Sequence, residues 1–174
     1  MRVKPQIPVR HKWNHIVIVG EAPGKEEDKQ KKVFVGRAGK MLNETLRQAG
    51  IRHKHCLIIN PFNQRPPGNS IKYFFEGPPY HSNVKRKFRP QIELLHNTLL
   101  KYNPAMILLL GRTAGWVLTN YTGTLAARFG KVVIGDHGPM MYLYHPAYLL
   151  RDPTNITQQI KYLKLARIIA KQLL

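Results

Sequence analysis

The stretch that decides the fold is His15-Ile-Val-Ile-Val-Gly-Glu-Ala-Pro-Gly24. Residues 16–19 form an unbroken β-branched run without polar alternation, which predicts a parallel strand that is buried on both faces. The Gly/Pro turn ends this strand and places the carboxylate of Glu21 at its carboxyl end. Ligands bind at that edge of an open α/β sheet. The simpler alternative is a tight turn that carries a solvated glutamate.

Working outward, three more apolar runs predict the main strands of the same sheet. They lie at 56–59, 105–110 and 140–144, and a shorter run at 132–134 suits an extra strand. Helical spacing of apolar residues predicts helices between and after the strands, at 39–50, 90–103, 112–118 and 155–174. Four main strands separated by helices imply a parallel sheet with helices on both faces.

The helical spacing also predicts which side chains face the core. In the helix at 90–103 the inward residues are Ile92, Leu95, Leu99 and Leu100, and in the C-terminal helix they are Ile156, Ile160, Leu163, Leu165, Ile168 and Ile169. No internal repeat or linker is visible, so residues 1–174 are interpreted as a single domain.

Two segments lie outside this regular pattern. Residues 1–14 are basic, contain two prolines, and are expected to form an N-terminal arm. Residues 71–87 mix aromatic and basic side chains with Pro78-Pro79, and form a connection longer than most in a compact domain. Such a segment suits contact with nucleic acid. The alternative is a surface flap with a small apolar cluster of its own.

The charge indicates the class of partner. The 174 residues hold 28 Lys and Arg against 9 Asp and Glu, a formal net charge of +19. Four of the nine acidic residues lie between Glu21 and Asp28, so the remaining surface is almost uniformly cationic. This balance favours a polyanionic partner, above all nucleic acid. Association with a ribosome or with an anionic membrane surface is the alternative, although no polybasic amphipathic helix stands out.

Cysteine usage and the N-terminus indicate the compartment. A single cysteine, Cys56, excludes an internal disulfide or a thiolate-ligated cluster held by this chain alone. There is no apolar signal core and no run long enough to span a membrane. The sequence therefore predicts an intracellular, soluble protein without membrane contact, and we expect it to be a monomer.

The strand ends carry the candidate site. Glu21, Asn60, Gly111-Arg112 and His145 each follow one of the four main strands, so they should meet at one edge of the sheet. A carboxylate, an amide and an imidazole converging there form a plausible site. Each alone is weak evidence, because a histidine or asparagine before proline is more often structural.

In combination these motifs resemble the uracil-DNA glycosylase superfamily, most closely its family 4. The resemblance covers residues 16–152 and rests on four motifs in matching order. They are Gly20-Glu-Ala-Pro-Gly24, Phe34-Val-Gly-Arg-Ala-Gly39, Asn60 with the later Arg65-Pro-Pro-Gly-Asn69, and His145-Pro-Ala-Tyr-Leu-Leu-Arg151. It implies a three-layer α/β/α sandwich around a four-stranded parallel sheet. It also implies a monofunctional enzyme that removes uracil from DNA and initiates base excision repair.

The resemblance further implies a role for each matching residue. Phe34 would stack on the flipped uracil, Asn60 would bond its edge and reject cytosine, and His145 would stabilise the departing base. Leu149, alone or together with Tyr148, would enter the gap in the base stack. The remaining implied residues are Glu21, Glu27 and Asn69 around the water and sugar, Ala22 and Arg65 at the substrate, and Arg112, Leu150 and Arg151 at the DNA.

The chain departs from the family pattern in its cysteines. Family 4 enzymes hold an iron–sulfur cluster with four cysteines, whereas this chain has Gln64 and the neighbourhood of Phe88 at two of those positions and lacks the N-terminal pair. We therefore expect no cluster, no metal and no other cofactor, with segment 71–87 a candidate source of the missing packing. At the turn, Ala22 stands where family 1 enzymes place a catalytic aspartate, so water activation falls to Glu21, Glu27 or Asn69.

Other functions fit the same residues. A protein that binds uracil-containing DNA without turnover is one, including a covalent trap through His81 in the inserted segment. A glycosylase for other deaminated bases, such as hypoxanthine or xanthine, is another. A basic α/β nucleic-acid binder without catalysis is the least specific alternative.

Overall fold

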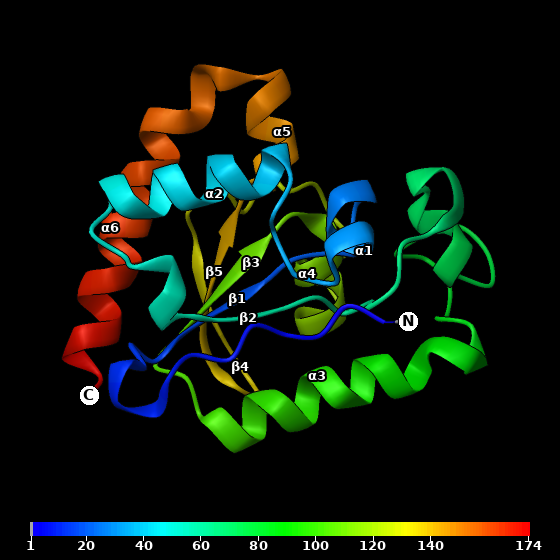
Figure 1. Cartoon of the computed structure of the whole chain (residues 1–174), viewed down its shortest axis with the longest axis horizontal. Helices are drawn as coiled ribbons and strands as arrows, with labels where there is room; N and C mark the ends of the chain where they lie inside the picture. The colour runs from blue at the N-terminus through cyan, green and yellow to red at the C-terminus, as the bar shows by residue number, and fades with distance from the viewer. Residues whose placement is uncertain (1) are drawn as a thin grey trace.

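A computed structural model describes residues 2–174 and shows one sheet with strand order β2-β1-β3-β5-β4 (Figure 1). Strands β1, β2, β3 and β5 run parallel to one another. Their residues are largely buried and apolar, as a parallel arrangement requires, because both faces of such a sheet are covered. The strands are β1 (Ile16–Val19), β2 (Leu57–Ile59), β3 (Met106–Leu110), β4 (Val132–Gly135) and β5 (Gly138–Leu143).

The sheet has five strands, so the expectation of four is corrected. The additional strand, β4, is the short run suggested at 132–134, and it pairs with β5 in antiparallel orientation. The two strands are separated only by Asp136 and His137, and so short a connection joins antiparallel neighbours. Ile134 is 77% exposed, as suits a strand at the edge of the sheet.

Helices cover both faces of the sheet and give three layers (Figure 1). Helices α2 (Arg37–Gln48) and α6 (Ile156–Gln172) pack on one face. Helices α3 (Arg89–Tyr102) and α4 (Arg112–Thr119) pack on the other face. The two short helices α1 (Lys25–Gln30) and α5 (Pro146–Arg151) follow β1 and β5 and lie toward the carboxyl ends of the strands.

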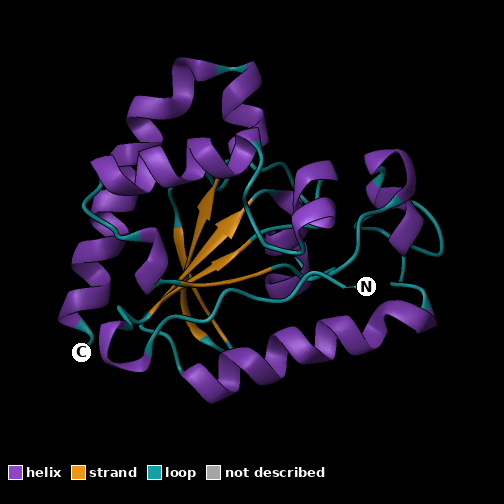
Figure 2. Ribbon diagram, viewed as in Figure 1, coloured by secondary structure: helices purple, strands orange, loops and turns teal. Residues whose placement is uncertain are grey.

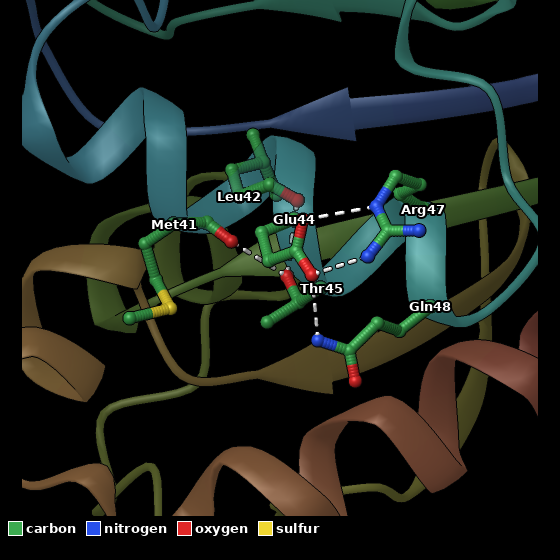
Figure 3. Close-up of polar contacts among 6 residues, drawn as sticks. All are labelled: Met41, Leu42, Glu44, Thr45, Arg47 and Gln48. Carbon is green, nitrogen blue, oxygen red and sulfur yellow. Dashed lines mark hydrogen bonds and ion pairs between the residues drawn. The ribbon is translucent and has the colours of Figure 1, made fainter.

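Helix α2 shows how one helix divides its two faces (Figure 3). On the exposed face, Arg47 and Gln48 both donate hydrogen bonds to the carboxylate of Glu44, which lowers the pKa of Glu44 to about 2. On the buried face, the Thr45 hydroxyl donates to the backbone carbonyl of Leu42 one turn earlier. A buried hydroxyl satisfied within its own helix allows that face to pack against the sheet.

Two helices bury a narrower stripe than the sequence predicted. In α3 Leu95 and Leu99 are buried, whereas Leu100, expected to face inward, is 66% exposed. In α6 Leu165 and Ile168 were also expected to be buried and are exposed. The face of α6 that packs against the sheet consists of Gln159, Leu163, Ala166 and Ala170, and the two alanines permit a close approach. Leu165 and Ile168 lie at other angles around the helix axis and therefore point away from the sheet.

The N-terminal segment is not a loose arm. Val3 is buried, and its backbone N–H donates to the carbonyl of Asn63 at 2.7 Å. Gln6 forms an antiparallel bridge with Ile58 of β2. The expected basic arm therefore docks on the sheet, because β2 is an edge strand whose free backbone groups pair with this segment.

The inserted segment 71–87 shares a small aromatic core with its flanking residues and lies at one end of the molecule (Figure 2). Phe62 and Phe74 stack with ring centroids 3.9 Å apart, and Phe75, Val84 and Phe88 complete the buried cluster. The aromatic side chains thus point mostly inward, as in the flap interpretation. Within residues 2–174 no helix is long and apolar enough to cross a membrane.

Candidate active site at the carboxyl edge of the sheet

The four polar strand-end residues meet at one edge, as the sequence predicted. Glu21 follows β1, Asn60 follows β2, Arg112 follows β3 and His145 follows β5, and these four strands are parallel. In Figure 1 the arrowheads of these four strands all point toward the side of the sheet where α1 and α5 lie. The topology therefore brings residues separated by more than a hundred positions to one place.

Phe34 and Asn60 flank Gly20, the first residue after β1. A Cβ atom placed on Gly20 would lie 2.3 Å from Oδ1 of Asn60 and 2.8 Å from Cζ of Phe34. Both side chains occupy space that any residue other than glycine would need. The ring of Phe34 also lies 5.9 Å from the ring of His145, centroid to centroid. Asn60 and His145 are thus gathered around the Phe34 ring.

Asn60 carries an unsatisfied acceptor. Its Oδ1 atom is buried and finds no hydrogen-bond partner among residues 2–174. Buried polar atoms are nearly always paired in folded proteins, because leaving one unpaired costs about 1–3 kcal/mol. An orphaned acceptor beside an aromatic ring is therefore a feature of a binding site for a planar molecule with a matching N–H donor.

His145 is held in a defined tautomer. It precedes α5 and its Nδ1 atom accepts a hydrogen bond from the backbone N–H of Ala147 at 3.2 Å. Burial lowers the pKa of His145, so the imidazole is neutral near pH 7. A neutral ring whose Nδ1 accepts carries its proton on Nε2, which leaves that nitrogen as a donor.

Glu27 supports the loop that carries Phe34. Its Oε1 atom accepts hydrogen bonds from the backbone N–H groups of Val35 and Gly36, at 2.9 and 2.7 Å. Gly36 is the residue that caps the start of α2, so this carboxylate satisfies free donors at a helix N-terminus. Phe34 itself has a backbone φ of 50°, which is uncommon outside glycine and marks a strongly held conformation.

Glu21 is linked to two residues that the sequence analysis missed. The hydroxyl of Thr113, in the first turn of α4, donates to Oε2 of Glu21 at 2.5 Å. The hydroxyl of Tyr80 lies 2.9 Å from the Thr113 hydroxyl oxygen. No motif pointed to either residue. Thr113 directly follows the strand-end pair Gly111-Arg112, which is the one signal that could have drawn attention to it.

Asn69 and Arg65 lie farther along the loop after β2. Asn69 is exposed, and its Oδ1 atom accepts from Nε of Arg65 at 2.9 Å. Asn69 therefore has its acceptor engaged by a neighbouring side chain. Ala22 is partly buried and packs against the aromatic cluster of the inserted segment. Its predicted contact with the substrate stays a prediction.

The residues predicted to contact DNA are not equally exposed. Arg151 and Arg112 are exposed, and Tyr148 and Leu150 are partly exposed. Leu149 is fully buried in α5, so its predicted insertion into the base stack does not fit its position in this structure. On a helix of six residues only part of the circumference faces outward, and Leu149 lies on the inner side.

The residues present do not suit an iron–sulfur cluster. Such clusters are held by cysteine thiolates, and the one cysteine is buried, with the pKa of its thiol raised to about 12 by burial. At the positions of the other expected ligands, Gln64 accepts a hydrogen bond from the Gln91 side chain, and Phe88 is buried in the aromatic cluster. Within residues 2–174 no group of three or more His, Cys, Asp or Glu is placed to hold a metal ion.

Comparison with known proteins agrees with this geometry. The profile of the Uracil DNA glycosylase superfamily matches residues 13–167, and the chain belongs to this superfamily. Within it, the chain is similar to proteins named type-4 uracil-DNA glycosylase. It is 35% identical to that of Thermotoga maritima over 153 residues, which cover 83% of this chain and 71% of the relative.

Two archaeal relatives with the same name show comparable similarity. The protein of Pyrobaculum aerophilum is 32% identical over 146 residues, covering 79% of this chain and 69% of the relative. That of Archaeoglobus fulgidus is 34% identical over 146 residues, covering 79% and 68%. The family predicted from the motifs is thereby confirmed.

Proposed function

We propose that this protein is a monofunctional DNA glycosylase that hydrolyses the N-glycosidic bond of flipped-out deoxyuridine and so initiates base excision repair. The single observation that carries the proposal is the orphaned Oδ1 of Asn60 beside Phe34 and His145. The names of the type-4 relatives and the net charge of +19 support DNA as the substrate.

The three residues around Phe34 suit recognition of a uracil ring. The aromatic face of Phe34 contributes roughly 1–3 kcal/mol by stacking. The Oδ1 atom of Asn60 accepts from N3–H of uracil, and its amide N–H group donates to O4. Cytosine presents the opposite pattern at both positions, and the unpaired buried groups that result disfavour its binding.

His145 and Glu21 suit the chemical step. As the bond between C1′ and N1 breaks, its electron pair leaves with uracil, and the Nε2–H group of His145 donates to O2 of the departing anion. Water adds its oxygen to C1′ and gives up a proton. We assign this proton to Glu21, whose Oε2 atom is held by Thr113. Glu27 instead holds the Phe34 loop through two backbone N–H groups, and Asn69 is an amide, which is too weak a base to take the proton.

We further propose that the protein works without an iron–sulfur cluster. Gln64 and Phe88 replace two of the expected ligands with a hydrogen-bonded amide and a buried ring. The stacked Phe62–Phe74 pair, with Phe75, supplies packing around this part of the fold. Purified protein should show no absorbance near 400 nm, and treatment with an iron chelator should leave excision and the melting temperature unchanged.

The partner is uracil-containing DNA, and we propose that a monomer acts on it. Arg151 of α5 is exposed, and Tyr148 and Leu150 of the same helix are partly exposed, and this helix directly follows His145. These observations support the proposal that the three residues contact the strand that carries the flipped base. Leu150 rather than Leu149 is the apolar side chain available to fill the gap in the stack. Flipping costs a few kcal/mol, which these contacts must offset.

The proposal is tested with a labelled oligonucleotide that contains one deoxyuridine. The protein is incubated with this substrate, and with matched substrates that hold deoxycytidine or deoxyinosine, before alkali treatment and a denaturing gel. Multiple turnovers on deoxyuridine alone support the proposal. A stoichiometric heat-stable adduct instead supports a covalent trap, retention without cleavage supports a binder, and preferred cleavage at deoxyinosine supports a different base specificity.

A further inference from the structure

A hydrogen-bonded chain joins the inserted segment to the candidate active site. Thr113 donates to Oε2 of Glu21 at 2.5 Å, and the hydroxyl of Tyr80 lies 2.9 Å from the Thr113 oxygen. Thr113 is fully buried in the first turn of α4, between the site and the insertion. The contact crosses from residues 71–87 to the carboxyl end of β1 through one side chain.

The chemistry of Tyr80, Thr113 and Glu21 determines which group donates and which accepts in these two hydrogen bonds. An ionised carboxylate only accepts hydrogen bonds, so the single hydroxyl proton of Thr113 is committed to Glu21. The Thr113 oxygen must then accept, and the phenol of Tyr80 supplies the donor. Burial, with a further contribution from the charge of Glu21, raises the pKa of Tyr80, so its hydroxyl keeps its proton near neutral pH.

Tyr80 is held in place from several sides. The guanidinium of Arg112 lies over its ring, 4.5 Å from the centroid. The rings of Phe75 and Trp116 meet it edge-on, at centroid distances of 5.7 and 6.2 Å. Its backbone φ is 68°, a left-handed conformation that non-glycine residues rarely adopt. Such a residue stays in place only where its surroundings determine its position.

We propose that Tyr80 is a positioning residue for Glu21: acting through Thr113, it holds one carboxylate oxygen so that the other is available to the attacking water. This inference rests on the proposed glycosylase activity. It makes segment 71–87 part of the active-site support, beyond its role as a surface flap. Two other charged or titratable groups interact electrostatically with these residues: His145 after β5 with Glu21, and Arg112 of α4 with Tyr80.

The first test removes only the hydroxyl of Tyr80. Tyr80→Phe keeps the ring that contacts Arg112, Phe75 and Trp116, and Tyr73→Phe is the matched control in the same segment. We expect Tyr80→Phe to lower kcat about tenfold, as loss of a bond that acts on a charged group should. Its KM should stay within about twofold of wild type, and Tyr73→Phe should match wild type in both. Equal kcat in Tyr80→Phe and wild type would overturn the proposal.

A double-mutant cycle separates positioning from general structure. In a Glu21→Gln background the hydroxyl of Tyr80 has no carboxylate to orient, so Tyr80→Phe should have little further effect on the residual rate. Thr113→Val, which removes the connecting hydroxyl at nearly constant volume, should reproduce the kcat loss of Tyr80→Phe without adding to it. A fully additive effect in either combination would show that Tyr80 acts independently of Glu21.

The final measurement does not depend on activity. Carboxyl ¹³C NMR at one fixed pH compares the chemical shift of the Glu21 side chain in wild type, Tyr80→Phe and Tyr73→Phe. Because Tyr80→Phe removes the donor behind the Thr113–Glu21 hydrogen bond, the Glu21 signal should move in Tyr80→Phe alone. An unchanged Glu21 signal overturns the positioning role. If wild type excises no uracil but the Glu21 signal moves in Tyr80→Phe, the proposed function fails while the structural link stands.

Discussion

At the scale of single residues, the site is organised around groups left without partners or held in unusual conformations. Asn60 keeps an unpaired acceptor, and Phe34 has a left-handed backbone. Both features cost stability in the free protein. They fit the proposal that this pocket binds a ligand.

Asn60→Ala distinguishes a binding role from a structural one. Excision of uracil should fall by roughly 100-fold or more, because the edge of the base loses both its acceptor and its donor. The free energy of unfolding should stay equal to that of wild type or rise, since the variant removes a buried acceptor that had no partner. Single-turnover kinetics and urea denaturation measure the two quantities. A destabilised variant with normal excision would assign Asn60 to the scaffold.

At the scale of elements, the loop before α2 and the helix after β5 carry the site. Gly39 lies in the first turn of α2, and a Cβ atom there would sit 1.8 Å from the carbonyl oxygen of Phe34. Helix α2 is therefore in direct contact with the backbone of Phe34. In α5, by contrast, His145 caps the helix while Leu149 anchors it to the core.

Gly39→Ala should damage the site through this contact. The new methyl group cannot coexist with the carbonyl of Phe34, so the loop has to move and the ring loses its position beside His145. We expect excision to fall at least about tenfold, with a larger effect on KM than the neighbouring control Ala38→Gly shows. Steady-state kinetics on the deoxyuridine oligonucleotide give both constants. Wild-type kinetics for Gly39→Ala would mean that the loop has room that the structure does not show.

Leu149→Ala and Leu150→Ala should separate anchoring from DNA contact. Removing the buried Leu149 side chain should lower the free energy of unfolding by about 2–5 kcal/mol. Removing the partly exposed Leu150 side chain should change stability little and should impair excision from duplexes more than from single strands. Chemical denaturation and parallel assays on both substrates measure this. If Leu149→Ala is stable but selectively defective on duplexes, Leu149 leaves the core when DNA binds.

At the scale of the whole molecule, charge governs association with DNA. The protein has a net charge of +19, so its affinity for DNA should fall as salt is added. A plot of log Kd against the logarithm of the salt concentration should be a straight line, with a slope of about 0.9 for each phosphate contact. Arg151→Gln should reduce that slope by about one unit. Lys101→Gln, in the last turn of α3 near the opposite edge of the sheet, should leave it unchanged. Fluorescence anisotropy at several salt concentrations measures the slope for both variants. A slope for Arg151→Gln equal to that of wild type would mean that DNA does not contact Arg151.

Acid should destabilise the whole fold below about pH 6.5. Burial lowers the pKa of His53 and of His145 in the folded protein, whereas both return to about 6.5 on unfolding. The unfolded chain then binds more protons, so the free energy of unfolding is fully present above pH 6.5 and falls below it. Urea denaturation at pH 7.5 and 5.5 should show the loss, and His53→Gln should reduce it. A pH-independent free energy of unfolding would contradict the buried neutral histidines.

The sequence by itself determined the four main strands, their parallel direction, the cationic surface and the edge where Glu21, Asn60 and His145 meet. Unbroken apolar runs and strand-end residues are local signals, and the parallel topology then leaves one possible edge. The tertiary structure decided the rest: the antiparallel fifth strand, the docking of the N-terminal segment, and the burial of Leu149. It also joined Tyr80 to Glu21 through Thr113. These depend on backbone conformation and on contacts between distant segments, which no local pattern of residues encodes.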